Sequence, residues 1–313
     1  MSESAFIESL RAFATHPAAR GLLDDAAILD IGGSRLVLTH DMIVEGVHYL
    51  PGDPPADVAW KLVAVNLSDL AAKGARPLGA LLGYALGEAE WDRAFAGGLK
   101  VALTAFDLPL LGGDTVAMPA GAPRALGLTA IGLAGEHVPG RDGAQPGDDL
   151  WLSGTIGDAG AGLALLQRGQ TGPAALIERY RTPRPRLEAG QRLAGLAKAM
   201  MDVSDGLLID AARMAAASGC TARIEIDALP LSEALLALGD SRDARLEAAS
   251  AGDDYELLFA AAPKRAGQIL ALADSLGLSL SRIGAFTAGE GLLLTDRDEP
   301  VALPARLGFE HRR

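Results

Sequence analysis

The sequence predicts two consecutive domains, an α+β domain over residues 1–138 and an α/β domain over residues 139–313. Its 313 residues are enough for about two domains of ordinary size, and 49% hydrophobic residues can fill two cores. Strand-like and helix-like periodicities alternate through both parts of the chain. Residues 137–147 read HVPGRDGAQPG, and this cluster of glycine, proline and polar residues is typical of a boundary loop.

The first domain is expected to combine helices with strands. Residues 56–73 carry Val58, Leu62 and Val65 at roughly helical spacing, and they end on Gly74, which suits the left-handed position after a helix. The other expected elements are helices at residues 3–15 and 91–105 and strands at residues 27–29, 35–39, 78–86, 109–111 and 125–134.

The second domain is expected to pack helices against a sheet. Helical segments are predicted from about residue 159 to residue 198, and another helix follows residue 205. The expected strands cover residues 150–153, a segment that ends near residue 203, and residues 223–226, 255–261, 280–285 and 292–295.

Charge and composition exclude several classes of protein. Forty acidic and 28 basic residues give a net charge of −12, which disfavours binding to nucleic acid and to anionic membranes. The chain has no leader-like N-terminus and no apolar run of about 18 residues. The single cysteine, Cys220, excludes a disulfide framework and a cysteine zinc site. We therefore expect a soluble cytoplasmic protein whose acidic clefts hold phosphates only through cations, of which magnesium fits best.

Several carboxylates lie beside or inside apolar segments, where charged groups are costly. Asp24 and Asp25 precede an apolar strand, Asp41 follows another, and Asp69 lies within an apolar helix. Two carboxylates about 4 Å apart would repel each other by about 4 kcal/mol at an effective dielectric constant of about 20, so a converging set would require a cation. The spacing does not establish convergence. Turn residues at Asp24 and Asp25, and a surface pair between Asp69 and Lys73, remain as alternatives.

Two motifs combine a carboxylate with a backbone that suits phosphate. In residues 112–114, Gly-Gly-Asp, the glycines would let backbone N–H groups approach a phosphate while the carboxylate binds a cation. Residues 202–205, Asp-Val-Ser-Asp, join a strand to a helix whose N-terminus favours an anion. A helix N-cap at Ser204, with Asp205 in the first turn, is the structural alternative.

Other signals are weaker. No Walker-type phosphate loop is present, and the glycines of residues 157–162 are in the wrong order for a dinucleotide fingerprint. Arg141 could reach a nucleotide phosphate or lie in solvent, and His48 could contact a substrate or only be packed.

Taken together, six segments resemble the thiamine-monophosphate kinase family, which shares a superfamily with aminoimidazole ribonucleotide synthetase and selenophosphate synthetase. The resemblance extends over nearly the whole chain. Five segments mark the superfamily, whereas Val-Glu-Gly-Val-His at residues 44–48 and Asp-Tyr-Glu-Leu at residues 254–257 are particular to the kinase. The six segments are residues 24–27 (DDAA), 39–48 (THDMIVEGVH), 66–75 (NLSDLAAKGA), 112–115 (GGDT), 202–207 (DVSDGL) and 251–257 (AGDDYEL).

The resemblance implies an aminoimidazole ribonucleotide synthetase-like fold. In such a fold the sheet of the N-terminal domain pairs with that of a second copy in a homodimer barrel, and ATP lies between the N-terminal and C-terminal domains. The implied reaction transfers the γ-phosphoryl group of ATP to thiamine monophosphate and gives thiamine diphosphate and ADP. Because a phosphate monoester is mostly a dianion at pH 7, the acceptor needs no general base. Catalysis would depend on positioning and on magnesium.

The resemblance also implies roles for individual residues. The magnesium ligands would be Asp25, Thr39, Asp41, Asp69, Asp114, Asp202 and Asp205. ATP would contact Gly113, Asp114, Arg141 and Ser204. Thiamine monophosphate would contact His48, Asp253 and Phe309, with the Phe309 ring stacking on the cationic thiazolium.

Three residues depart from the family pattern. His40 replaces a small hydroxyl residue, Lys73 stands where methionine is common, and Asp253 replaces a glutamate. The change at His40 puts one side-chain metal contact in question. The shorter Asp253 would reach its partner through water.

Two other functions fit part of the pattern. A synthetase of the same superfamily would act on another acceptor, such as a purine intermediate or selenide. Selenide chemistry would require a reactive cysteine near the N-terminus, whereas Cys220 lies far along the chain. A nucleotide-binding regulator would have kept the ATP site without turnover, and the complete carboxylate set argues against it.

Overall fold

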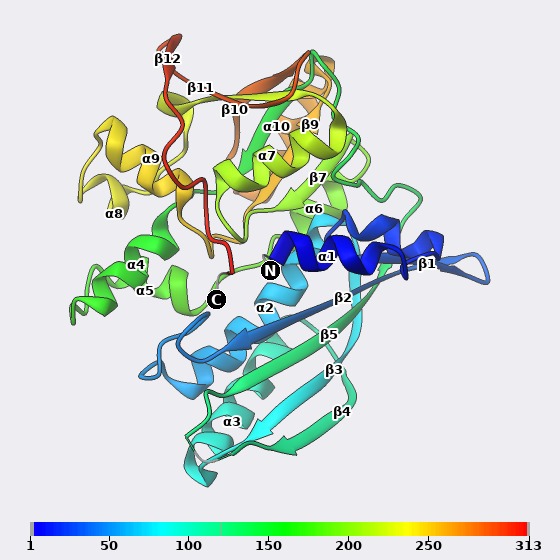
Figure 1. The fold of residues 1–313 in the computed structure, drawn as a ribbon, viewed down its shortest axis with the longest axis vertical. Coiled ribbons are helices and arrows are strands. Elements are labelled where there is room, and N and C mark those ends of the chain that lie inside the picture. The colour runs from blue at the N-terminus through cyan, green and yellow to red at the C-terminus, as the bar shows by residue number, and fades with distance from the viewer. Residues whose placement is uncertain (1–2, 120, 312–313) are drawn as a thin grey trace.

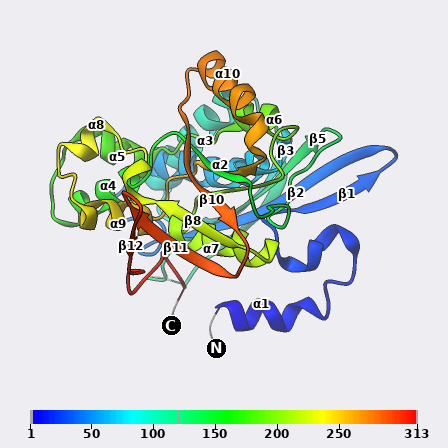
Figure 2. The same cartoon turned by 90° about the horizontal axis from the view of Figure 1, so that it is seen from above.

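The computed structural model describes residues 3–119 and 121–311 and contains two sheets, one above the other in Figure 1. A five-stranded sheet comes from the N-terminal part of the chain and a seven-stranded sheet from the C-terminal part. A short helix, α1 (Glu3–Arg11), and a 3-10 segment, η1 (Pro17–Leu22), precede the first strand, and α1 stands apart from both sheets in Figure 2. Within the described residues no helix has the length and apolar character needed to cross a membrane.

The five-stranded sheet has the strand order β1-β2-β5-β3-β4. Its neighbours are antiparallel except β3 and β4, which are parallel and are connected by α3 (Ala89–Ala105). The strands are β1 (Ala27–Ile31), β2 (Ser34–Val44), β3 (Arg76–Leu86), β4 (Leu110–Ala117) and β5 (Ala125–Ala134).

One face of this sheet is covered by α2 (Pro55–Ala72) and α3. Alternate strand residues such as Val37, Ile43 and Leu128 pack against these helices in one hydrophobic core. α2 is buried on nearly all sides because its far end also packs against the C-terminal part, through Ala71 and Ala72. The helix therefore carries residues of its buried face directly to the boundary between the two parts.

The seven-stranded sheet has helices on both faces, with α7 (Leu207–Ser218) and α10 (Ala266–Leu276) on opposite sides in Figure 2. Leu150 and Leu152 pack into the core under α7, whereas Trp151 between them packs into the core under α10. Central strands buried on both faces are expected to be continuously apolar.

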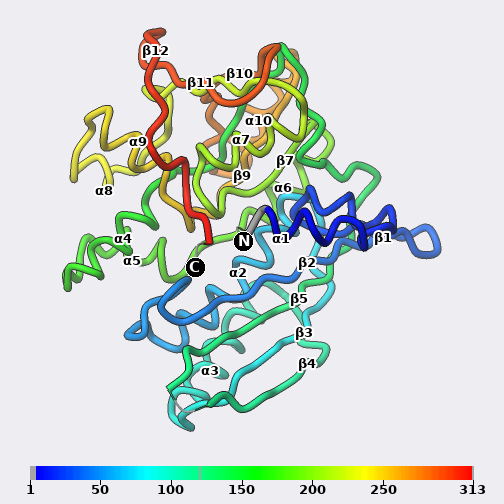
Figure 3. The backbone as a smooth tube through the Cα atoms, in the orientation of Figure 1, coloured from blue at the N-terminus to red at the C-terminus, as the bar shows by residue number. Residues whose placement is uncertain are grey.

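The strand order of the second sheet is β12-β11-β8-β10-β6-β9-β7, antiparallel except for β8 and β11. The strands are β6 (Asp149–Ser153), β7 (Ala199–Asp202), β8 (Thr221–Glu225), β9 (Leu257–Ala261), β10 (Leu280–Thr287), β11 (Gly291–Asp296) and β12 (Glu299–Val301). The remaining segments are α4 (Asp158–Gln167), α5 (Ala174–Arg181), α6 (Leu187–Leu193), η2 (Ile226–Ala228), α8 (Glu233–Leu236), α9 (Arg242–Ser250) and η3 (Pro263–Arg265). Figure 3 shows the C-terminal segment running from β12 back to the boundary between the sheets.

The predicted elements differ from the structure mainly at their ends. The first helix stops at Arg11 instead of residue 15. β2 continues to Val44 instead of ending at residue 39, because β5 pairs with it from Arg35 to Val44 and holds the polar residues in the ladder. Helical structure ends at Leu193 rather than residue 198. The short strand β12 and the helices α8, α9 and α10 were not predicted.

The two parts of the molecule are packed closely where α6 crosses the end of α2. A Cβ atom added at Gly190 would lie 2.0 Å from the carbonyl oxygen of Ala71, so the two backbones are in direct contact there. This contact fixes the end of α2, and with it the side chains that α2 presents to the C-terminal part.

Replacing Gly190 by alanine is expected to lower the free energy of unfolding by about 1–3 kcal/mol, because the helices must separate to admit a methyl group. Gly97→Ala on α3 is the matched control, since a Cβ there meets nothing within 4 Å. The control should raise stability by about 0.5–1 kcal/mol through helix propensity. Urea unfolding followed by circular dichroism measures both, and equal effects would contradict the close contact.

A buried carboxylate site between the two sheets

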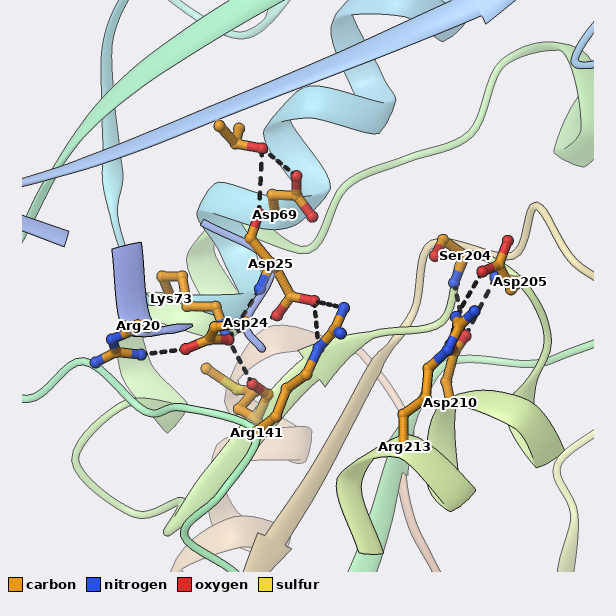
Figure 4. Close-up of polar contacts among 12 residues, drawn as sticks. Arg20, Asp24, Asp25, Asp69, Lys73, Arg141, Ser204, Asp205, Asp210 and Arg213 are labelled. Atoms are coloured by element: carbon orange, nitrogen blue, oxygen red, sulfur yellow. Dashed lines mark hydrogen bonds and ion pairs between the residues drawn. The ribbon is translucent and has the colours of Figure 1, made fainter. Parts of the chain in front are cut away.

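Three carboxylates from separate segments converge between the two sheets. Asp25 lies just before β1, Asp69 on α2 and Asp202 at the end of β7, and one oxygen of each lies within 4.8 Å of the others. All three are shielded from solvent by the packing of the two parts (Figure 4 labels Asp25 and Asp69). The structure therefore brings these three candidate metal ligands together.

The alternation of β2 brings two more predicted residues to this place. Thr39 and Asp41 lie on the same face of β2 as Val37 and Ile43, which is the face that α2 covers. The Thr39 hydroxyl donates a hydrogen bond to the Asp69 carboxylate. The backbone N–H of Asp41 donates to the side-chain oxygen of Asn66 on α2, at 2.8 Å.

Burial and mutual repulsion make these carboxylates resist ionisation. Burial, and then the charges of Asp41 and Asp202, raise the pKa of Asp69 well above its usual value. Burial and the charge of Asp25 do the same to the pKa of Asp202. Burial and Asp25 raise the pKa of Asp41 to about 6, with a smaller contribution from Asp205. A divalent cation would relieve this repulsion, and oxygen atoms are the ligands that hard cations prefer.

Asp25 behaves differently because cations lie beside it. Burial alone would raise its pKa, but Lys73 and Arg141 outweigh burial and hold the pKa at about 2. The Lys73 ammonium lies 2.6 Å from one carboxylate oxygen, and the Arg141 guanidinium donates to the other, with its Nε at 2.8 Å. The alternative of Arg141 in solvent is therefore wrong.

Lys73 also belongs to a chain of ion pairs that leads toward the surface. Lys73 also pairs with Asp24, and Asp24 pairs in turn with Arg20 of η1 (Figure 4). Lys73 is fully buried, and it further donates to the carbonyl oxygen of Met200 at 3.1 Å. The alternatives of plain turn residues at Asp24–Asp25 and of a surface pair between Asp69 and Lys73 are both wrong.

The segment after β7 is organised by a carboxylate that the sequence analysis did not single out. Asp210, in the first turn of α7, accepts hydrogen bonds from the backbone N–H groups of Ser204, Asp205 and Gly206 at 3.1–3.3 Å. α7 begins at Leu207 with Gly206 as its N-cap, so the alternative of Ser204 as the N-cap is wrong. An aspartate inside the apolar run of residues 207–212, four residues after a glycine, was the available signal.

Asp205 and Asp210 share a cation. Arg213 lies 2.5 Å from Asp205 and 2.8 Å from Asp210. Burial raises the pKa of Asp210 to about 6, and Arg213 opposes this shift. Asp205 is close enough to Asp41 to raise its pKa, so it borders the carboxylate cluster.

Asp114 is not brought to the cluster within this chain. β4 is an exposed edge strand, and its register pairs Asp114 with Gly83, which lies on the same sheet face as Leu81. That face is opposite to the one that α2 covers, since Leu82 packs toward the helices. Gly113 is required by close packing, because a Cβ would lie 1.9 Å from the Leu82 carbonyl oxygen. His40 also lies on the open face, 2.9 Å from the Thr129 hydroxyl.

The three residues predicted to contact the substrate gather at one place. The ring of His48 lies 5.2 Å from that of His311, and the ring of His311 lies 4.9 Å from that of Phe309. Asp253 is linked to the backbone of His48 by Lys61, whose ammonium lies 2.8 Å from the Asp253 carboxylate and 2.9 Å from the His48 carbonyl oxygen.

Lys61 was missed by the sequence analysis. It is 2% exposed, and its ammonium lies 4.1 Å from the centre of the Tyr180 ring. A lysine inside the apolar run of residues 58–65 on α2 was the signal that could have identified it. Burial, and then the charge of His311, lower the pKa of His48, which favours a neutral imidazole.

Comparisons with known proteins agree with this arrangement. Two families match, AIR synthase related protein, N-terminal domain, over residues 23–134, and its C-terminal domain over residues 145–296. A thiamine-monophosphate kinase of Caulobacter vibrioides is 43% identical over 94% of this chain and 86% of its own length. One from Salmonella typhimurium is 39% identical over 93% and 91%. The chain belongs to the thiamine-monophosphate kinase family.

Solved structures of the family superpose closely on this chain. The structure described as AaThiL complexed with AMPPCP and TMP has a TM-score of 0.86 at 30% identity, covering 99% of this chain and 97% of that one. The thiamine-monophosphate kinase from Stenotrophomonas maltophilia K279a has a TM-score of 0.79 at 40% identity, covering 94% and 95%. Hydrogenase maturation protein HypE, at 21% identity and a TM-score of 0.72, shares the fold.

In this member of the kinase family, the raised pKa values predict a pH-dependent stability. Without divalent cations, the free energy of unfolding should fall as the pH rises from about 4 to about 7. The folded-state pKa of about 6 at Asp41 and Asp210 exceeds the ordinary value of 3.8, so the stability that these groups provide when protonated is lost as the pH rises through 6. Each shift corresponds to at most about 3 kcal/mol.

Urea unfolding in EDTA at a series of pH values measures this decrease. Asp41→Asn should make it smaller, whereas Asp243→Asn, at an exposed position of α9, should leave it unchanged. A stability that is constant or rises over this range, or an unchanged slope in Asp41→Asn, would contradict the raised pKa values.

Proposed function

We propose that this protein transfers the γ-phosphoryl group of ATP to thiamine monophosphate, giving thiamine diphosphate and ADP. Family membership supports the reaction, and the observation that carries it is the convergence of Asp25, Asp69 and Asp202. The relative with a TM-score of 0.86 is described as a complex with AMPPCP and TMP, which are an ATP analogue and the acceptor.

Magnesium is the proposed cation of this cluster. Its ligands would be drawn from Asp25, Thr39, Asp41, Asp69, Asp202 and Asp205, which lie in or beside the cluster, and the buried oxygen donors with raised pKa values fit a hard divalent ion. Bound there, magnesium would neutralise charge on the transferring phosphoryl group. Arg141 and Ser204 would contact ATP.

We also propose that the boundary between the two domains lies between residues 138 and 139, and that the protein is located in the cytoplasm.

The remaining chemistry needs positioning rather than a base. A phosphate monoester is mostly dianionic at pH 7 and can attack without losing a proton. Arg141, fixed by Asp25, would present its remaining N–H groups to phosphate oxygens. Lys61, Asp253 and His48 would form the acceptor end, with Phe309 facing the thiazolium ring.

Asp202→Asn and Asp69→Asn are expected to lower kcat at saturating magnesium by about 100-fold or more, because each removes a charged ligand from the cluster. Both variants should be at least as stable as the wild type in EDTA, since each removes one of several repelling buried carboxylates. Activity is measured by ADP release, and stability by thermal unfolding. Near-normal turnover in both variants would exclude the metal assignment.

Asp253→Asn is expected to raise the KM for thiamine monophosphate by about tenfold, since a charge-assisted contact contributes about 1.5–3 kcal/mol. The KM for ATP should change little, because Asp253 lies with His48 and Lys61 rather than with the carboxylate cluster. Asp243→Asn is the control at an exposed site. Equal changes in both KM values would place Asp253 outside the acceptor end.

We also propose that the protein forms a homodimer through its five-stranded sheet. The open face of the five-stranded sheet exposes apolar side chains, including Met42 and Leu81, and the edge strand β4 is exposed along its whole length. Exposed apolar sheets and unpaired edges favour association. A second copy packed on this face, in a barrel, would give Gly113 and Asp114 a site that they lack within one chain.

Leu81→Glu is expected to convert the dimer into a monomer, because a charge would be buried in the apolar sheet contact. Val101→Glu, on the outer side of α3, is the control and should stay dimeric. Light scattering after size-exclusion chromatography gives the mass. A monomeric wild type, or two dimeric variants, would reject this interface.

The same ADP-release assay separates the alternatives. Release that depends on thiamine monophosphate supports the kinase, release that depends on another acceptor supports a related synthetase, and ATP binding without release supports a regulator.

A further inference from the structure

A large cavity lies on the side of the molecule where the N-terminal segment meets the C-terminal part. Its volume is about 930 Å³, and it is lined by η1, the start of the first sheet, residues 136–139, residues 194–198 and the segment at η3. This volume is in the range that accommodates a small organic ligand. The carboxylate cluster and the residues of the acceptor end do not line it.

The charge of the lining is opposite to that of the protein. Five lysine and arginine side chains line the cavity, against two carboxylates, in a chain with a net charge of −12. The five are Arg20, Arg35, Lys198, Lys264 and Arg265. Three of these cations are paired with carboxylates: Arg20 with Asp24, Arg35 with Asp30 and Lys198 with Asp148. Within the described residues Lys264 and Arg265 form no ion pair, and their positive charge favours an anionic ligand.

Arg20 connects this cavity to the catalytic carboxylates. It lines the cavity and donates to Asp24 and to the Val138 carbonyl oxygen. Asp24 pairs with Lys73, and Lys73 pairs with Asp25 of the cluster (Figure 4). The backbone of Arg20 has a φ of 48°, a left-handed conformation that is uncommon outside glycine and that surrounding contacts must maintain.

We propose that this cavity binds a phosphate-bearing small molecule, and that Arg20 links its occupancy to the carboxylate cluster. Phosphate accepts several charge-assisted hydrogen bonds at once, which matches a lining with Lys264, Arg265 and Arg20. A phosphate that engages Arg20 competes with Asp24 for the guanidinium. Asp24 then holds Lys73 more strongly, and Asp25 is left less neutralised and more available to a cation.

Equilibrium dialysis with inorganic pyrophosphate, in EDTA, tests the site without metal-dependent binding at the carboxylates. A parallel series with ADP distinguishes a bare phosphate anion from a nucleotide. Saturable binding of either probe is expected, about tenfold weaker in the double variant Lys264→Glu/Arg265→Glu and unchanged in Asp202→Asn. The matched control is Arg93→Glu/Lys100→Glu on the exposed side of α3, which should bind like the wild type.

Thermal unfolding checks that the charge-reversed variant is folded, and Lys264→Gln/Arg265→Gln repeats the test with a milder change. Absence of binding by both probes, or binding that neither cavity variant weakens, would overturn the site. The link is tested separately with Asp24→Asn, which releases Arg20 and should tighten probe binding several-fold. An affinity equal to that of the wild type would overturn the link through Arg20. These measurements need no turnover, so their failure is distinct from failure of the proposed kinase reaction.

Discussion

The burial of like charges between the two sheets is the constraint on which the rest of the structure depends. One carboxylate oxygen of each of Asp25, Asp69 and Asp202 lies within 4.8 Å of the other two. In water each carboxylate would be solvated separately, so bringing the three together in a buried site is costly. Among these three, and within the described residues, Asp25 alone forms ion pairs, with Lys73 and Arg141. The site therefore combines one ionised carboxylate with neighbours that gain most from a divalent cation.

Helix α2 makes this burial possible because it lies between the five-stranded sheet and the C-terminal part of the molecule. The helix packs on the five-stranded sheet along one side and on α6 and β7 at its end, so it can carry both Asp69 and Lys61 into buried positions. Asp69 faces the carboxylates, and Lys61 faces Asp253 and Tyr180. The distance between the two polar centres is set by one rigid helix, which suits a reaction that depends on positioning.

Sequence reasoning predicted the two-domain α/β organisation, because strand and helix periodicities reflect local burial. It singled out Asp25 and Asp69 because carboxylates beside apolar segments are unusual, and Asp202 because it lies where a strand meets a helix. Their shared role as magnesium ligands was implied by the family resemblance. Sequence reasoning missed Lys61 and Asp210, whose roles depend on partners from distant segments. The same limit applied to Ser204: a serine before a helix resembles an N-cap, but Asp210 holds the local backbone N–H groups instead. The case of Asp114 shows that a sequence motif can place a residue on a strand without indicating on which face of the sheet its side chain lies.

The most direct test of the central claim is proton release when magnesium binds. Because the pKa of Asp41 is raised to about 6 and the pKa values of Asp69 and Asp202 are raised well above normal in the cation-free protein, binding at the cluster should release about one proton or more per chain at pH 5. Calorimetric titration in buffers of different ionisation enthalpy measures that number. Saturable binding with proton release, lost in Asp202→Asn, is the predicted result. Binding without proton release, or binding that Asp202→Asn leaves intact, would contradict a buried carboxylate site for the cation.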